Sequence, residues 1–302
     1  MWPTLFWPAA VMQQGMDLMN RQLLASQCRL LRETLSELST SARLPHDVER
    51  SCFQIGDCDA ELISPKGSST QRYLLYVHGG GFALGSLDTH RELVTTLARF
   101  ADARVLAIDY RLAPDYPYPA GLDDVDLAYQ WLLDQKVPAA RIALAGDSAG
   151  GGLVVALMQR LLQQKRPVPA AGVLFSPWLD LTCSSASLDL NVATDLLLNP
   201  IQMKAFAALY AGREALESPE ISPLFGNMRG LPPLLVQVSQ QELLLDDARR
   251  LAHRITEQAG EVELQEVAWM PHVWQLLYRY LPQAVASLRQ ASRFIRQQVP
   301  AE

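Results

Sequence analysis

The chain has 302 residues, with 26 Lys plus Arg against 32 Asp plus Glu, so its formal net charge at neutral pH is −6. The length suits one large α/β domain, and the acidic balance excludes nucleic acid as a partner because phosphate would be repelled. Apolar residues make up 49% of the chain and charged residues 19%, which is too apolar for disorder. The apolar excess must fill a large core, an apolar pocket or an interface.

The cysteines and the N-terminus bear on compartment and membrane contact. The four cysteines are Cys28, Cys52, Cys58 and Cys183. They contain no CxxC pair, so we expect reduced thiols, no zinc site and a cytoplasmic location. The N-terminal run MWPTLFWPAAVMQQGM has two prolines and no basic residue, unlike a signal peptide or a spanning helix. Trp2, Phe6 and Trp7 could touch a membrane surface, but without adjacent basic residues we expect no stable membrane insertion.

Short β-type runs alternate with helical patterns along the chain. The runs expected as strands are Ala60–Pro65, Arg72–Val77, Arg104–Tyr110, Arg141–Ala145, Gly172–Ser176, Leu234–Val238 and Val262–Val267. Several of them are almost wholly apolar, as suits strands buried on both faces of a parallel sheet. The expected helices are His90–Ala101, Gly121–Asp134, Gly150–Gln164, Asp246–Gln258 and Leu281–Gln298. This alternation predicts a doubly wound α/β sheet.

Two segments interrupt that alternation. Val11–Leu38 is a long amphipathic stretch ahead of the sheet, and Asp189–Glu220 is inserted between two strands and is helical around Ile201–Ala211. The apolar side chains on or near one stripe of the first segment are Met12, Met16, Met19, Leu23 and Leu24. We interpret both segments as a cap; the alternative is ordinary packing on the surface of the sheet.

The run Gly146-Asp147-Ser148-Ala149-Gly150 fits G-x-S-x-G and lies between a strand and a helix. A nucleophile elbow requires this context, because a tight turn raises the serine hydroxyl above the sheet. The helix that follows adds a positive dipole end near developing negative charge. A glycine-rich turn with a capping serine is the alternative. No lysine stands near these glycines, so the run is not a phosphate loop.

His78-Gly79-Gly80-Gly81-Phe82 follows directly after the strand YLLYV. Consecutive glycines leave backbone N–H groups open to a ligand oxygen, and fixed donors stabilise the oxyanion of acyl transfer. The backbone N–H of Ala149, directly after the serine, is the expected co-donor. We therefore expect an oxyanion hole from the N–H groups of Gly80, Gly81 and Ala149, with Gly79 as a substitute donor; the alternative is a flexible glycine turn.

Two histidines follow Ser148 in the chain, as a Ser–acid–His order requires. His253 stands among charged residues in a helical pattern, where a solvated position is expected, whereas His272 follows a strand in the turn WMPHVW. A histidine just beyond a strand end can reach the elbow, so His272 is the expected base. The alternative is a hydrogen-bonded core histidine.

The acid should lie at the end of the strand LLVQV, where the sequence continues SQQELLLDD. A buried carboxylate there would fix the tautomer of the histidine. Glu242 occupies the strand end and is the expected acid. Asp246 is the second candidate, although Asp246 and Asp247 also suit the first turn of a helix.

Together these motifs resemble the hormone-sensitive-lipase-like branch of the α/β-hydrolases, the bacterial carboxylesterases. The matching runs are HGGGF at 78–82, DYRLAPDYPYPA at 109–120, GDSAGG at 146–151, SPWLDLT at 176–182, ELLLDD at 242–247 and HVW at 272–274. Where the family usually has D-x-L-x-D, this chain has Glu242 at the first position and Asp246 at the second. That departure leaves the choice of acid open.

The resemblance implies an α/β-hydrolase fold, with a mostly parallel eight-stranded sheet flanked by helices and covered by a helical cap. Residues 1–45 would form the N-terminal cap helices and residues 46–302 the catalytic domain, with a cap insertion at about 187–220. It also implies hydrolysis of small acyl esters of short to medium chain length without a metal or organic cofactor. Arg111 and Asp147 would hold loops behind the site.

The same resemblance places an acyl pocket between cap and elbow. The apolar residues that could line it are Phe82, Leu84, Trp178, Leu179, Met203 and Phe206, with Met12 and Met16 from the N-terminal segment. Ordinary core packing is the alternative for each of them. An amidase or lactonase could use the same triad, and a non-catalytic binder on the same fold is disfavoured because Ser148, His272 and a carboxylate are all present. The sequence leaves a homodimer open.

Overall fold

The computed structural model describes residues 18–39 and 44–301. Its centre is one eight-stranded sheet in the order β1-β2-β4-β3-β5-β6-β7-β8. The strands are β1 (Val48–Ile55), β2 (Cys58–Pro65), β3 (Tyr73–Val77), β4 (Arg104–Ile108), β5 (Ile142–Asp147), β6 (Ala171–Phe175), β7 (Leu234–Ser239) and β8 (Val262–Val267). All pairs from β4 to β8 are parallel, while β1–β2 and β2–β4 are antiparallel. The predicted mostly parallel eight-stranded sheet is confirmed.

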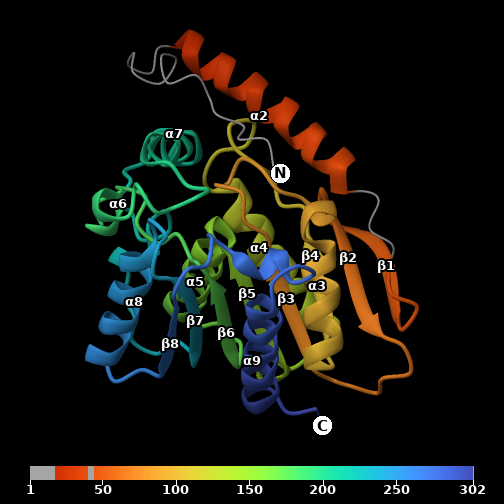
Figure 1. Cartoon of the computed structure of the whole chain (residues 1–302). Helices are drawn as coiled ribbons and strands as arrows, with labels where there is room; N and C mark the ends of the chain where they lie inside the picture. Colours follow the sequence, from red (N-terminus) through yellow and green to blue (C-terminus); the bar gives the residue numbers. More distant parts are fainter. Residues whose placement is uncertain (1–17, 40–43, 302) are drawn as a thin grey trace.

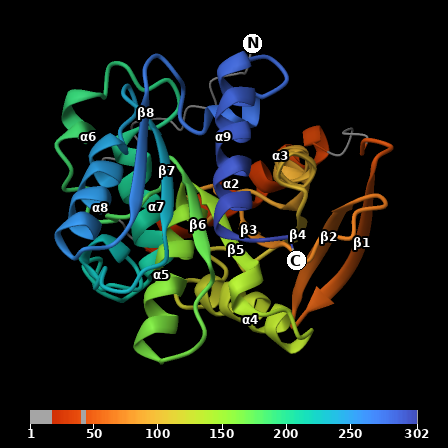
Figure 2. The same ribbon diagram turned by 90° about the horizontal axis from the view of Figure 1, so that it is seen from below.

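Helices cover both faces of the sheet (Figures 1 and 2). One face carries α3 (Leu87–Ala101) and α9 (Pro282–Gln298). The other face carries α4 (Ala120–Asp134), α5 (Ala149–Gln163) and α8 (Leu245–Glu257). These five helices are the predicted ones, with ends that differ by at most three residues. Short 3₁₀ turns lie at Ala139–Arg141, Pro223–Phe225 and Trp274–Leu277.

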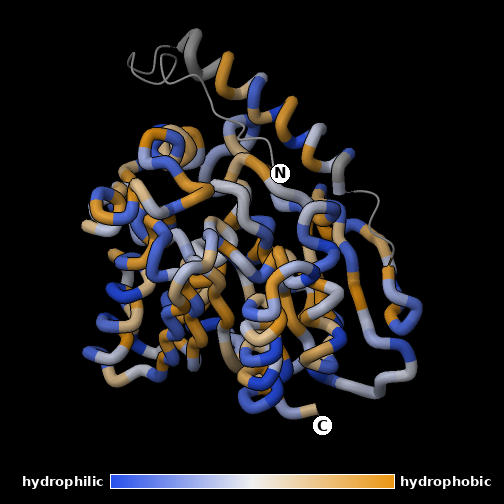
Figure 3. The backbone as a smooth tube through the Cα atoms, viewed as in Figure 1, coloured by the Kyte–Doolittle hydropathy of each residue, from blue (hydrophilic) through white to orange (hydrophobic). Residues whose placement is uncertain are grey.

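Alternate residues of each central strand enter two separate cores. In β3, Leu75 and Val77 pack under α4 and α5, whereas Leu74 and Tyr76 pack under α3 and α9. Successive side chains of a strand point to opposite faces, so a strand covered on both faces must be apolar throughout. Figure 3 shows the hydrophobic colour concentrated in the strands and the hydrophilic colour on the outer helix surfaces. Much of the apolar excess therefore lies in these two cores.

One strand was not anticipated. β1 reads VERSCFQI and is mostly exposed between its buried ends, Val48 and Ile55. It pairs only with β2, through a turn at Gly56 whose φ is +59°. An edge strand with polar side chains on both faces lacks the apolar run by which the other strands were identified.

Two helical segments lie at the end of the sheet where the glycine loops emerge (Figure 1). α2 (Leu18–Ser39) confirms a helix in the predicted N-terminal segment, while Met12 and Met16, like Trp2, Phe6 and Trp7, lie outside the described residues. On α2, Leu24 is buried but Leu23 is 45% exposed, so the apolar stripe is narrower than expected. The insertion contains α6 (Ser187–Leu190) and α7 (Pro200–Ala211). Among the described residues, no helix is both long and apolar enough to cross a membrane.

Candidate active site

Ser148 occupies the single residue between β5 and α5, at φ 50° and ψ −121°. A positive φ is strained for a residue with a side chain and persists only where neighbours enforce it. Here the Ser148 N–H donates to the Phe175 carbonyl oxygen at 2.9 Å, and its own carbonyl accepts from the Trp178 N–H at 2.9 Å. The backbone of Ser148 is therefore fixed at the carboxyl edge of the sheet. The residue is 8% exposed.

Gly150 explains how the turn can be so tight. A Cβ at this position would lie 2.1 Å from the Val77 carbonyl oxygen and 2.5 Å from that of His78. Only glycine permits this approach. The close contact brings the start of α5 against the end of β3, where the His78–Phe82 loop begins.

The backbone N–H groups of that loop divide into two kinds. The Gly79 N–H donates to Asp147 Oδ1 at 3.0 Å, so it is already hydrogen-bonded and is not available as a substitute donor to an oxyanion. The N–H groups of Gly80, Gly81 and Ala149 donate no hydrogen bond to the described part of the chain. Gly80 has a φ of 116°, and its carbonyl accepts from the Leu84 N–H at 2.8 Å, which curls the loop into a fixed turn.

On the opposite side of Ser148, the structure brings His272 and Glu242 together. His272 Nδ1 lies 3.4 Å from Glu242 Oε2, and both side chains are buried, with residue exposures of 7% and 1%. Glu242 follows β7 and His272 follows β8, so adjacent parallel strands deliver both groups to one edge of the sheet. By contrast, His253 is exposed on α8 and pairs with Glu257.

Ser176 is a site residue that sequence reasoning missed. Its hydroxyl donates to Glu242 Oε2 at 2.8 Å and accepts from the Val273 N–H at 3.3 Å, directly after His272. It therefore links the carboxylate to the backbone of the histidine loop. Its signal was available: Ser176 follows β6 in the SPWLDLT run, the strand-end position that also suggested Glu242.

Burial and pairing act in opposite directions on this pair. Burial raises the pKa of Glu242, and the hydrogen bonds from His272 and Ser176 offset that only in part. Burial lowers the pKa of His272, but the hydrogen bond and negative charge of Glu242 outweigh it, so the pKa is raised from its usual value of 6.5. Glu242 Oε1 is buried without a hydrogen-bond partner among the described residues. Among the described residues, the side-chain contacts of this carboxylate therefore go through Oε2, to His272 and Ser176.

Asp246, the second candidate acid, and its neighbour Asp247 bind backbone N–H groups elsewhere in the chain. Asp246 Oδ2 accepts from the Ser187 N–H at 2.9 Å, and its Oδ1 lies 3.6 Å from Arg249. Asp247 Oδ2 accepts from the Leu179 and Asp180 N–H groups, each at 2.9 Å. Burial raises the pKa of Asp247 to about 6. Neither carboxylate has a hydrogen bond to His272 in the described structure.

The apolar residues expected to line a pocket differ in burial. Four of them are no more than 3% exposed: Phe82, Trp178, Leu179 and Met203. Phe82 stacks on Tyr210 of α7 with 3.9 Å between ring centroids. Leu84 and Phe206 are only partly buried, and a Cβ on Gly81 would lie 2.9 Å from Phe206. Phe206 therefore stands directly against the glycine loop, and the four buried residues belong to the larger apolar core.

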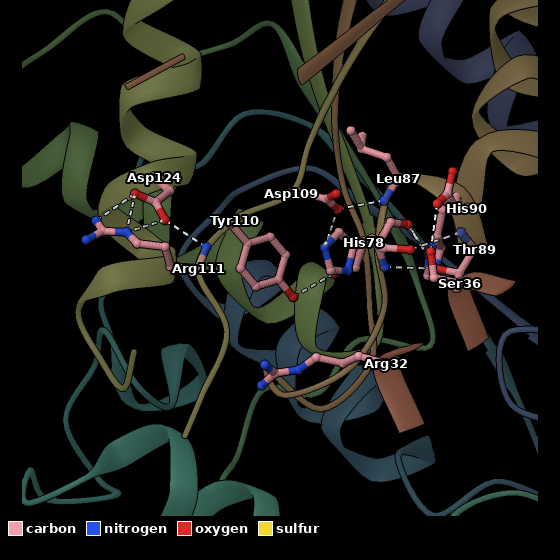
Figure 4. A network of polar contacts seen from close by, with 12 residues as sticks. Arg32, Ser36, His78, Leu87, Thr89, His90, Asp109, Tyr110, Arg111 and Asp124 are labelled. Carbon is pink, nitrogen blue, oxygen red and sulfur yellow. Dashed lines mark hydrogen bonds and ion pairs between the residues drawn. The ribbon is translucent and has the colours of Figure 1, made fainter. Parts of the chain in front are cut away.

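Side chains behind the loop anchor it to the fold. Figure 4 shows Tyr110 beside His78 and, further along, the Arg111–Asp124 pair. The Tyr110 hydroxyl donates to the His78 carbonyl oxygen at 2.9 Å, and Arg111 Nη2 lies 2.7 Å from Asp124 Oδ1. On the outer side, Arg32 of α2 donates to the Ala83 carbonyl oxygen at 2.7 Å. The HGGGF loop is thus held from both below and above.

Known proteins share this fold. Residues 74–276 match the family described as alpha/beta hydrolase fold. The chain belongs to that family. An esterase from the bacterial hormone-sensitive lipase family superposes with a TM-score of 0.86 at 36% identity, covering 97% of this chain and all of the other. This places the chain in the hormone-sensitive-lipase-like branch of the α/β-hydrolases, as its motifs predicted.

Other relatives agree. A mutant of the esterase E40 superposes with a TM-score of 0.87 at 40% identity, covering 90% of this chain and 92% of the other. An acetyl-hydrolase of Streptomyces hygroscopicus is 41% identical over 242 residues, which are 80% of this chain and 81% of the relative. An esterase of Acinetobacter venetianus is 38% identical over 78% of this chain and 77% of its own. This α/β-hydrolase is a carboxylic ester hydrolase.

Proposed function

We propose that this α/β-hydrolase is a serine carboxylesterase that cleaves short- to medium-chain acyl esters through an acyl-enzyme. The strained backbone of Ser148 carries the proposal, because a serine at φ 50° between a strand and a helix has a structural cost that a simple capping role does not require. The His272–Glu242 contact on one side and the unpaired N–H groups on the other supply the partners that such a serine needs.

Acylation begins with attack of Ser148 Oγ on the ester carbonyl carbon, while the hydroxyl proton passes to His272 Nε2. Nδ1 faces Glu242, so Nε2 is the nitrogen left for this transfer. The oxyanion accepts hydrogen bonds from the N–H groups of Gly80, Gly81 and Ala149. The carbon–oxygen bond to the alcohol then breaks, and the alcohol leaves with the proton from His272.

Deacylation follows the same route. Water gives a proton to His272 as its oxygen attacks the acyl carbon, and Ser148 Oγ leaves and regains the proton. Glu242 keeps the imidazole in the productive tautomer and stabilises the imidazolium in both halves of the reaction. The products are a carboxylic acid and free Ser148.

The side chains near the glycine loop support the proposed substrate range. Phe82 and Trp178 are buried in the core, while the partly exposed Leu84 and Phe206 are left as the apolar contacts for the acyl chain. A small contact surface favours short acyl groups. A related protein is named acetyl-hydrolase, and the solved esterase EstE5, 32% identical, was soaked with p-nitrophenyl butyrate.

The Ser148→Ala variant tests the proposal. We expect hydrolysis of p-nitrophenyl butyrate to fall by at least about 10³-fold, because loss of the nucleophile leaves only binding and the oxyanion hole. Ser69→Ala, at an exposed loop serine, is the matched control and should retain full activity. Undiminished hydrolysis in Ser148→Ala refutes the proposal, and a series of esters from acetate to laurate tests the expected chain-length range.

A further inference from the structure

A second buried carboxylate lies directly behind the nucleophile. Asp147 precedes Ser148 and is 2% exposed. Its Oδ1 accepts from the Tyr76 hydroxyl at 2.7 Å and from the Gly79 N–H at 3.0 Å. Its Oδ2 lies 3.4 Å from Nε2 of His90, a residue in the first turn of α3. One carboxylate therefore joins the elbow, the glycine loop and a helix on the other side of β3.

The contacts of His90 favour its charged form. Nδ1 lies 2.8 Å from Thr89 Oγ1, and that hydroxyl gives its own hydrogen to the Ser86 carbonyl oxygen at 2.9 Å. Thr89 Oγ1 is therefore an acceptor toward Nδ1, as Asp147 Oδ2 is toward Nε2. Acceptors facing both ring nitrogens favour the doubly protonated imidazolium form. His90 is 6% exposed, so this charge is buried.

The neighbouring His78 has the opposite character. The two rings have centroids 5.5 Å apart. His78 Nδ1 lies 2.8 Å from the Gly79 carbonyl oxygen and donates to it, whereas buried Nε2 has no hydrogen-bond partner among the described residues and lies 3.9 Å from Asp109. Burial, together with the positive charge of His90, lowers the pKa of His78 to about 3. Only one of these two histidines is charged.

We propose that His90 is a positioning residue for ester hydrolysis: as an imidazolium it keeps the buried Asp147 carboxylate ionised, and Asp147 in turn fixes the glycine loop through Gly79. The inference rests on the proposed serine mechanism. A buried carboxylate without a countercharge tends to take up a proton or to shift toward solvent. Either change alters the anchor of Gly79, the residue next to the donors at Gly80 and Gly81.

The groups around His90 determine how pH acts on this anchor. Tyr76 faces it from β3, His78 and Asp109 from the loops after β3 and β4, and Asp147 from the end of β5. The adjacent residue, Arg91, is paired with Glu61 of β2 at 2.6 Å. Burial lowers the pKa of His90, but the charge and hydrogen bond of Asp147 outweigh it, so the pKa is raised from its usual value of 6.5. The imidazolium is therefore lost only as the pH rises through that raised value.

The first test is the His90→Gln variant, assayed with p-nitrophenyl butyrate and normalised to sites titrated by a fluorophosphonate. We expect kcat per titrated site to fall about tenfold, less than the roughly 10²–10³-fold cost of deleting an oxyanion donor outright. KM should stay within about twofold, because substrate contacts are unchanged. His253→Gln, at an exposed histidine of α8, is the matched control and should behave as wild type.

Asp147→Asn provides a second, nearly isosteric test should His90→Gln fold poorly. Asparagine keeps an oxygen acceptor for Tyr76 and Gly79 but removes the charge that keeps His90 protonated. We expect kcat to fall less than in His90→Gln. In both variants the alkaline side of the pH dependence of kcat should differ from that of the wild type. A purely structural role would lower the number of titrated sites and leave kcat per site unchanged.

Three results are therefore distinguishable. Wild-type kcat per site and an unchanged alkaline profile in both variants overturn the positioning role of His90. A loss explained wholly by fewer titrated sites also overturns it. A wild-type enzyme that the fluorophosphonate does not titrate instead contradicts the proposed serine mechanism, independently of His90.

Discussion

Two buried histidine–carboxylate contacts flank Ser148, and both are 3.4 Å long. In the His272–Glu242 pair, the histidine lies in the loop after β8 and uses Nδ1 for the carboxylate. In the His90–Asp147 pair, the histidine lies in α3 and has acceptors at both nitrogens. The same two functional groups, an imidazole and a carboxylate, at the same distance are thus suited to different tasks. A free ring nitrogen permits proton transfer, whereas a fully engaged ring can only hold charge in place.

The largest expected loss of activity distinguishes Glu242 from Asp147. Glu242→Gln should lower kcat/KM by about 10²–10⁴-fold, because the amide favours the wrong tautomer of His272 and does not stabilise its charged form. Asp147→Asn should cost much less, since it only loosens an anchor. Asp246→Asn, at the other candidate acid, is the control and should stay within about twofold, because that carboxylate binds the Ser187 N–H. If Asp246→Asn is the more damaging change, the acid is Asp246.

The pH dependence sharpens the same comparison. His272 must be neutral to accept the Ser148 proton, and Glu242 holds its pKa above 6.5, so kcat/KM should fall as pH drops through that raised value. Glu242→Gln removes the stabilising charge and leaves the burial, which moves the acid limb to lower pH. His90→Gln should leave the acid limb in place, because it acts on the other side of Ser148. A pH–rate series for the three proteins checks both statements.

The smallest expected effect concerns the outer support of the loop. Arg32 of α2 donates to the Ala83 carbonyl oxygen and pairs with Asp115 at 2.9 Å. Arg32→Met keeps most of the aliphatic stem and removes these bonds, so we expect a loss of kcat/KM of about two- to fivefold, in the range of a lost charged hydrogen bond that is partly exposed. Glu33→Ala, at an exposed neighbour on α2, is the control. An unchanged rate and chain-length preference would argue against a cap role for α2.

The features that the sequence predicted are those that depend on a local pattern of residues. Apolar strands, the G-x-S-x-G turn and the strand-end positions of Glu242 and His272 all follow from runs of a few residues. β1 was missed because an exposed edge strand has no apolar run. His90 was missed because its partner Asp147 lies 57 residues away in the chain and on another element. Ser176 stands 66 residues from Glu242, and only its strand-end position could have identified it. No spacing rule reveals the His90–Asp147 pair. The burial of four expected pocket residues could not be predicted either, because burial depends on what packs above them.

The central claim is that Ser148 carries the acyl group. The most direct measurement is peptide mass spectrometry of the protein after reaction with a fluorophosphonate, run in parallel on wild type and Ser148→Ala. The account predicts one adduct per chain, located on the peptide that contains Ser148 and absent from the variant. An adduct on another residue, or no adduct in an enzyme that hydrolyses esters at its full rate, would contradict it.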